Sequence, residues 1–92
     1  MSNKLSEYGY SFQIKILTCL FTDKAFLQQI IDILDSKFFE NDANKFIVDI
    51  IKEYFNEYKS PPSREVLKVK ITEIDNDVLK KTVIEHIKDI FR

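Results

Sequence analysis

Cys19 and His86 are the two side chains of this 92-residue sequence whose chemistry best suits metal binding or catalysis. A structural zinc ion takes about four Cys or His ligands, or three of them and a carboxylate. The chain has one cysteine and one histidine, and the hydrophobic pattern places them on different helices. We therefore expect no metal site. Cys19 falls on the predicted buried face of its helix, where a thiol behaves as a small hydrophobic side chain, so we interpret it as an inert core residue.

His86 lies between Val83 and Ile90 at the edge of an apolar stripe. A histidine that acts as a general base usually needs a partner that orients it. Glu85 is its neighbour in sequence, but consecutive residues point to different sides of a helix. We therefore interpret His86 as a packing residue.

Phosphate binding and carboxylate chemistry are the next possibilities. A loop of the G-x-x-x-x-G-K type needs at least two glycines, and Gly9 is the only glycine in the chain. The acidic residues Glu73, Asp75 and Asp77 cluster at the start of a predicted helix, where the helix dipole favours negative charge. We therefore expect neither a bound cofactor nor catalytic activity from this chain.

Aromatic side chains and a Pro-Pro break are the remaining candidates, and they suit protein binding. A tyrosine combines an apolar ring with a polar tip and is enriched at protein interfaces. We interpret Tyr54, Phe55 and Tyr58 as core residues; the alternative is that they shape a partner groove beside the prolines. Of Phe38 and Phe39, we expect one ring to anchor a loop and the other to be available for contact. The predicted partner-contact residues are Phe38, Phe39, Tyr54, Tyr58, Pro61 and Pro62.

The composition indicates a single helical domain with a well-solvated surface. Hydrophobic residues make up 45% of the chain and charged residues 32%. One glycine and two prolines are too few for the frequent turns of a β-sandwich or barrel, so the predicted fold class is all-α, a compact bundle of about five helices. The net charge of −1 implies that any DNA contact is weak or indirect. A single cysteine, and the lack of a signal peptide or long apolar run, favour a cytoplasmic protein without a membrane span.

Five amphipathic segments must position these side chains. We interpret residues 1–10 as a flexible lead-in and residues 11–92 as one helical domain. Apolar residues at a helical period predict helices over 11–21, 23–34, 42–58, 64–71 and 76–92. The apolar pattern continues to the last residue, so we expect the chain to be part of a longer protein. Suitable N-caps are Ser11, Thr22 or Asp23, Asn41 or Asp42, and Ser63.

The same spacing predicts which residues of each helix are buried, and it makes the third helix the central one. The predicted core positions are Phe12, Ile16, Cys19 and Leu20 in the first helix, with Ile14, Leu17 and Phe21 widening the buried face to more than one side; Phe26, Leu27, Ile30, Ile31, Ile33 and Leu34 in the second; Ala43, Phe46, Ile47, Ile50, Ile51, Tyr54, Phe55 and Tyr58 in the third; Val66, Leu67 and Ile71 in the fourth; and Val78, Leu79, Val83, Ile87, Ile90 and Phe91 in the fifth.

An ordered series of residues in the middle of the chain resembles a known protein family. The series is Thr22-Asp23, Ile33-Leu34, Phe38-Phe39-Glu40, Ala43, Ile47, Ile50-Ile51, Glu57-Tyr58, Ser60, Pro62-Ser63 and Leu67. Over roughly residues 11–71 it resembles the N-terminal domain of DnaB-type replicative DNA helicases, especially the tailed-phage version. Asn44-Lys45 and Lys59-Ser60 depart from the bacterial pattern, which has a His-Arg pair and a glycine in these places. Residues 72–92 match only in being helical.

The resemblance implies a division of labour between domains. In the family, the ATPase motor, which uses ATP and magnesium, lies in a separate C-terminal domain. The N-terminal domain forms a collar on the hexameric ring and helps to recruit primase. This chain has the length of the globular head alone. The resemblance therefore implies a non-catalytic head domain that contacts other helicase subunits and a primase or helicase loader.

Two alternatives fit the same residues. The first is a stand-alone small phage or bacterial interaction protein, such as an adaptor or inhibitor, which only the reading frame beyond Arg92 separates from a helicase. The second is a small helical DNA-binding domain. A DNA-binding domain of this kind needs a basic recognition helix, and the net charge of −1 disfavours this alternative. DNA binding with a steep salt dependence would favour it.

Overall fold

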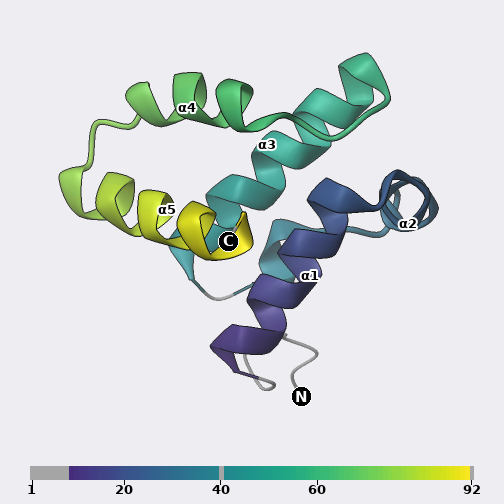
Figure 1. Cartoon of the computed structure of the whole chain (residues 1–92), viewed down its shortest axis with the longest axis horizontal. Coiled ribbons are helices and arrows are strands. Elements are labelled where there is room, and N and C mark those ends of the chain that lie inside the picture. Colours follow the sequence, from purple (N-terminus) through teal and green to yellow (C-terminus); the bar gives the residue numbers. More distant parts are fainter. Residues whose placement is uncertain (1–8, 40, 92) are drawn as a thin grey trace.

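Five α-helices and one 3-10 turn form the regular structure of residues 9–39 and 41–91, the part of the chain that the computed structural model describes (Figure 1). This confirms the predicted all-α fold. α3 runs through the middle, with α1 on one side and α4 and α5 on the other. No described helix is long and apolar enough to cross a membrane. The elements are α1 (Tyr10–Thr22), α2 (Lys24–Ile30), η2 (Ser36–Phe38), α3 (Asp42–Tyr58), α4 (Arg64–Thr72) and α5 (Asp77–Ile90).

Polar side chains cap α2 to α5 at the predicted helix starts. Asp23, Asn41, Ser63 and Asn76 each accept a hydrogen bond from a backbone N–H in the first turn of the helix that follows, at 2.8 to 3.3 Å. Such a cap satisfies a donor that has no partner inside the helix, and contributes about 1 kcal/mol. The caps therefore fix where each helix begins.

α1 begins at Tyr10, one residue before the predicted start, and the prediction that Ser11 caps it is wrong. Gly9 holds the cap position without a side-chain hydrogen bond. Its φ of 88° is one that glycine adopts without steric cost. The ring of Tyr10 packs against His86, and this tertiary contact favours the additional helical residue. The rest of the predicted lead-in, residues 1–8, lies outside the described residues.

α2 ends at Ile30, four residues before its predicted end. The Ile30 carbonyl accepts hydrogen bonds from the N–H groups of both Ile33 and Leu34, at 3.0 and 2.8 Å, which closes the helix in a tight turn. The Leu34 carbonyl accepts a hydrogen bond from Lys52 Nζ of α3 and not from a backbone N–H of a longer α2. As a result Leu34 turns into the core, whereas Ile33 is 70% exposed and not buried as predicted.

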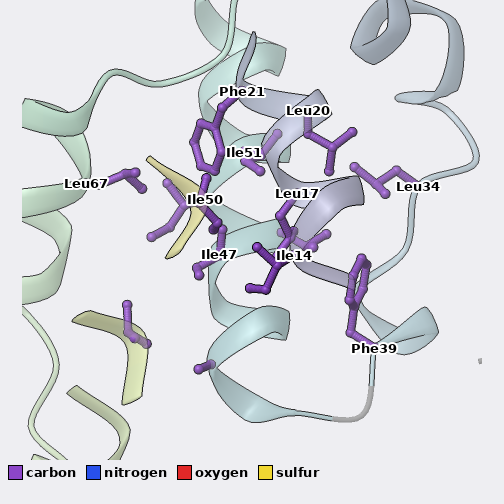
Figure 2. Packing of buried hydrophobic residues seen from close by; sticks show 14 of the residues in the cluster. Ile14, Leu17, Leu20, Phe21, Leu34, Phe39, Ile47, Ile50, Ile51 and Leu67 are labelled. Carbon is purple, nitrogen blue, oxygen red and sulfur yellow. The ribbon is translucent and has the colours of Figure 1, made fainter. Parts of the chain in front are cut away.

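One cluster of buried hydrophobic side chains holds the helices together (Figure 2). α3 contributes more residues to it than any other helix, which confirms α3 as the central one. Full burial of a Leu, Ile or Phe side chain contributes about 1.5–3 kcal/mol, so this cluster is the main stabilising element. Its members are Ile14, Leu17, Leu20, Phe21, Leu27, Leu34, Phe39, Ala43, Ile47, Val48, Ile50, Ile51, Phe55, Leu67, Ile74, Val83 and Ile90.

The buried face of α1 is narrower than predicted: Ile14, Leu17, Leu20 and Phe21 are buried as expected, and the other predicted positions are not. Cys19 and Phe12 are exposed, so the prediction of Cys19 as a core thiol is wrong. Apolar residues surround much of α1, and its sequence spacing therefore fits two neighbouring faces. Packing against α3 and α5 decides between them. The residues that face inward are Gln13, Ile14, Leu17, Leu20 and Phe21.

Two further predicted core residues, Tyr58 of α3 and Val78 of α5, are exposed. Each lies in a terminal turn of its helix, where fewer neighbouring elements cover a side chain. The apolar pattern alone carries no information about where a neighbouring helix stops. Tyr58 is instead part of the groove described below.

Pro61 and Pro62 end α3 and redirect the chain into α4, as the sequence predicts. A proline cannot donate a backbone hydrogen bond and its ring blocks helix continuation. Pro62 is buried and Pro61 is half-buried. After this turn α4 runs away from α3 and packs against α5 (Figure 1). Leu67 is its one fully buried side chain, so the side of α4 toward α3 stays open.

Lys59 closes α3 in the left-handed conformation, with φ 59°. This conformation costs a residue with a Cβ atom roughly 1–2 kcal/mol, and glycine is the usual residue in this position. We expect Lys59→Gly to raise the free energy of unfolding by about 0.5–1 kcal/mol, as measured by urea denaturation. Lys59→Ala is the matched control, because it also removes the hydrogen bond from Lys59 Nζ to the Asn56 carbonyl but keeps the strained φ. An equal gain in both variants would contradict the explanation.

Candidate functional site

An open apolar groove lies between the C-terminal half of α3 and α4, where the two helices diverge. It has a volume of about 310 Å³. One wall belongs to α3 and the other to α4, and apolar side chains predominate in both. We call it the α3–α4 groove. The residues that line it are Ile50, Glu53, Tyr54, Glu57, Tyr58, Val66, Val69 and Lys70.

Tyr54 and Tyr58 form the aromatic part of the α3 wall. They lie one helical turn apart, with ring centroids separated by 4.5 Å and ring planes inclined by 39°. Contact between two rings in such an arrangement contributes about 0.5–1.5 kcal/mol, which holds the exposed ring in place. Tyr54 is half-buried and Tyr58 is exposed in a groove that neither Pro61 nor Pro62 lines, whereas Phe55 is buried in the core as predicted.

Exposed apolar side chains stand on both walls of this groove. Tyr58 on α3 is 59% exposed and Val69 on α4 is 60% exposed. Scattered exposed hydrophobic residues are normal on a protein surface, whereas an adjoining group of them marks a binding site. Here the two residues come from opposite walls of one hollow. The α3–α4 groove is therefore the surface of the described chain best suited to a partner.

The other predicted contact residues lie outside the lining of this groove. Phe39 has no exposed surface and is the anchor of the Phe38-Phe39 pair, whereas Phe38 is 38% exposed. Phe38 thus stays a candidate for partner contact and Phe39 does not. The buried Pro62 is equally inaccessible, and the half-buried Pro61 serves to redirect the chain.

The sequence did not single out the α4 wall of the groove. Val66, Val69 and Lys70 are ordinary residues of a short amphipathic helix. The one available signal was that Val69 lies off the buried side of α4, which Leu67 marks. Whether such a residue is isolated or faces a hollow depends on where α3 lies.

A chain of buried hydrogen bonds links α1, α3 and α5. His86 Nδ1 lies 2.7 Å from Asn44 Oδ1, and Asn44 Nδ2 donates to Gln13 Oε1 at 2.9 Å. The Asn44 amide oxygen can only accept, so His86 Nδ1 carries the proton in this contact. All three side chains are buried. We call Gln13, Asn44 and His86 the polar cluster.

Tyr10 covers the polar cluster from its outer side. Its ring meets the His86 ring edge-on, with centroids 5.0 Å apart and planes at 71°, and its hydroxyl donates to the Asp89 carboxylate. These contacts hold α1 against α5. His86 is buried, as expected of a packing residue, but the ring lies inside the core with Asn44 as its partner and not at the edge of the stripe.

Gln13 and Asn44 were missed by sequence reasoning. Both lie within apolar faces of their helices. A polar residue within a buried face signals an internal hydrogen bond, because burial without a partner is costly. That signal was present in the sequence, but it did not identify the partners.

Burial lowers the pKa of His86 from its ordinary value of 6.5, an effect larger than the opposing attraction of the nearby carboxylates of Asp89 and Glu85. The unfolded chain therefore binds a proton at His86 more readily than the folded protein does. The stability that the neutral ring contributes is present above about pH 6.5 and is lost as the pH falls toward the lower pKa of the folded state.

We expect the free energy of unfolding to decrease as the pH falls from about 7.5 to about 5.5, with a smaller decrease for His86→Gln, which removes the titrating group. Urea denaturation of both proteins across this range measures the difference in slope. The same slope in the two proteins would contradict the assignment to His86.

Residues with metal-binding side chains are dispersed in the described part of the chain. No group of three or more His, Cys, Asp or Glu side chains there could hold a metal ion. Cys19 is at the surface and His86 in the core. Asp77 lies in the first turn of α5 as predicted. The prediction is wrong for Glu73, which ends α4, and for Asp75, which lies in the connection between the two helices.

Comparison with known proteins finds no matching family, no matching curated protein and no matching solved structure. The protein is therefore classified by its structure alone, as an all-α domain with an exposed apolar groove. The resemblance to helicase N-terminal domains stays a prediction that rests on the ordered residue series.

Proposed function

We propose that this chain is a protein-interaction domain and that the α3–α4 groove is its binding surface. The observation that carries the proposal is the meeting of Tyr58 and Val69, both more than half exposed, in one apolar hollow. Removing such surface from water favours association by about 25 cal/mol per Å². Tyrosines near the centre of an interface are among the residues that contribute most to binding.

In its specific form, the proposal is that the chain is the head of a replicative DNA helicase. The ordered residue series between Thr22 and Leu67 supports this form, as does the all-α fold around one long central helix. Two members of the series, Glu57 and Tyr58, also line the α3–α4 groove. The domain would contact neighbouring helicase subunits in the collar of the hexamer and recruit a primase or helicase loader. ATP and magnesium would belong to the motor domain.

Calorimetric titration of the protein with the primase and the helicase loader of the same genome tests the proposal. We expect one of them to bind, and Tyr58→Ala to weaken binding by about tenfold or more, which corresponds to about 1.4 kcal/mol. Ile33→Ala is the matched control, because Ile33 is an exposed apolar residue outside the groove. It should bind like the unmodified protein.

Two outcomes separate the helicase form from a stand-alone interaction module. The helicase form would be contradicted if neither partner binds this chain and neither binds a longer version that continues past Arg92. The reading frame beyond Arg92 gives an independent answer. A G-x-x-x-x-G-K loop further downstream supports a helicase motor, whereas a stop codon supports a small adaptor or inhibitor.

A further inference from the structure

The walls of the α3–α4 groove have the shape that accepts another helix. On α3, Tyr54 and Tyr58 stand one turn apart and form a ridge, and the buried Ile50, one turn before Tyr54, forms the floor beside them. On α4, Val66 and Val69 form a second, shorter ridge. Ridges at these spacings pack between the side-chain rows of a third helix. The two walls thus resemble two members of a helix bundle whose third member is absent.

A bound helix fits this groove better than an extended segment does. Both walls are helices, whose backbone groups are already paired within the helix. An added strand would find no sheet edge to receive its hydrogen bonds, whereas a helix satisfies its own. The rings of Tyr54 and Tyr58 touch each other at 4.5 Å, which leaves no slot between them for a proline ring. A helix is therefore the conformation that the walls select.

The charges at the rim indicate which helix binds. Glu53 and Glu57 are exposed on the α3 wall, one turn apart. Their spacing on the helix surface allows both carboxylates to approach one cation. Lys70, the single cationic residue of the lining, stands on the α4 wall. A ligand helix therefore needs a basic residue on its border over α3.

We propose that the α3–α4 groove binds an amphipathic helix of a partner protein. The apolar face of this helix packs on Tyr58, Val69 and the floor residue Ile50, and a Lys or Arg at its border contacts Glu53 and Glu57. This inference rests on the proposed interaction function and names the class of segment that is bound. α4 has nine residues, about 13 Å at 1.5 Å per residue, so the contact spans two to three turns of the ligand helix, with anchors at i, i+3 or i+4, and i+7.

Three synthetic peptides of about 15 residues, near the lower limit for a helix in water, test the inference by fluorescence anisotropy. The first is an amphipathic helix with leucine anchors and arginine at the border, the second has glutamate in place of arginine, and the third is proline-rich and extended. We expect the basic helix to bind at least about tenfold more tightly than the other two at low salt, with a smaller preference at high salt. Tyr58→Ala should weaken it by about tenfold.

Charge reversal supplies the decisive comparison. The double variant Glu53→Lys, Glu57→Lys changes exposed residues only, and should bind the acidic peptide more tightly than the basic one. The double variant Asp32→Lys, Asp75→Lys, an equal change in charge at exposed residues outside the groove, should keep the preference for the basic peptide. Circular dichroism before titration establishes that each variant is folded.

The outcomes separate this inference from the proposed function. Equal binding of the acidic and basic peptides, an unchanged preference in the double variant, or tightest binding of the proline-rich peptide would each overturn the inference. If the primase or loader binds but the basic peptide does not displace it, the inference is wrong and the interaction function stands. If the basic peptide binds as expected and neither partner does, the helicase form is wrong and the class of bound segment stands.

Discussion

Phe39→Ala is expected to lower the free energy of unfolding by about 3–5 kcal/mol, the usual cost of deleting a buried aromatic ring. Phe39 has no exposed surface and belongs to the same buried cluster as Ile14 and Leu34 (Figure 2). The loss has two parts, the transfer of the ring to water and the cavity that remains. A domain of this size has a total stability of only about 5–15 kcal/mol, so the variant should be close to unfolding. Urea denaturation followed by circular dichroism measures the change.

Phe38→Ala is the matched control for this prediction. Phe38 is the same residue type one position earlier, but it is 38% exposed and outside the buried cluster. Its replacement should cost about 1 kcal/mol or less. If Phe39→Ala proves too unstable to purify, Phe39→Leu keeps most of the volume and should cost roughly 1–1.5 kcal/mol. Equal costs at positions 38 and 39 would show that the ring of Phe39 does not anchor the loop.

Asn44→Leu is expected to lower the free energy of unfolding by about 2–6 kcal/mol. Asn44 stands in the middle of the polar cluster, between His86 Nδ1 and Gln13 Oε1. Leucine has the same branching and the same number of side-chain heavy atoms, so we attribute the loss mainly to the two buried polar groups that lose their partner, at about 1–3 kcal/mol each. The same denaturation experiment measures it.

A double-mutant cycle with His86→Phe separates this explanation from simple misfit of the leucine. When His86 is replaced by an apolar ring, Asn44→Leu strands only Gln13, so it should cost about 1 kcal/mol less than it does in the unmodified protein. Additive costs of the two substitutions would mean that the hydrogen bond between Asn44 and His86 contributes nothing measurable to stability.

The sequence predicted helix starts well because their causes are local. Asp23, Asn41 and Ser63 cap helices through hydrogen bonds that reach two or three residues along the chain. Pro61 and Pro62 end a helix through the stereochemistry of their own rings. Each of these signals is complete within a short segment, so reading the sequence was sufficient. The same holds for the all-α fold class, which follows from helical spacing in every segment.

Helix faces were predicted less well because burial depends on distant elements. Leu17 and Cys19 are both apolar positions of α1, yet Leu17 is fully buried and Cys19 is exposed. The difference is set by where α3 and α5 touch α1, and these helices come 20 or more residues later in the sequence. The end of α2 has a similar cause, since Lys52 of α3 donates a hydrogen bond to the carbonyl oxygen of Leu34.

The candidate sites show the same division. By itself, the sequence determined that the chain is an all-α domain and that Tyr54 and Tyr58 share a helix beside a proline turn. Only the tertiary structure decided that α4 diverges from α3, so that these tyrosines gain an opposite wall at Val69 and form a groove. It also joined Gln13, Asn44 and His86 across separations of 31 and 42 residues. Hydrogen bonds within a helix reach only four residues along the chain, whereas a groove and a buried polar cluster exist only where helices from distant segments meet.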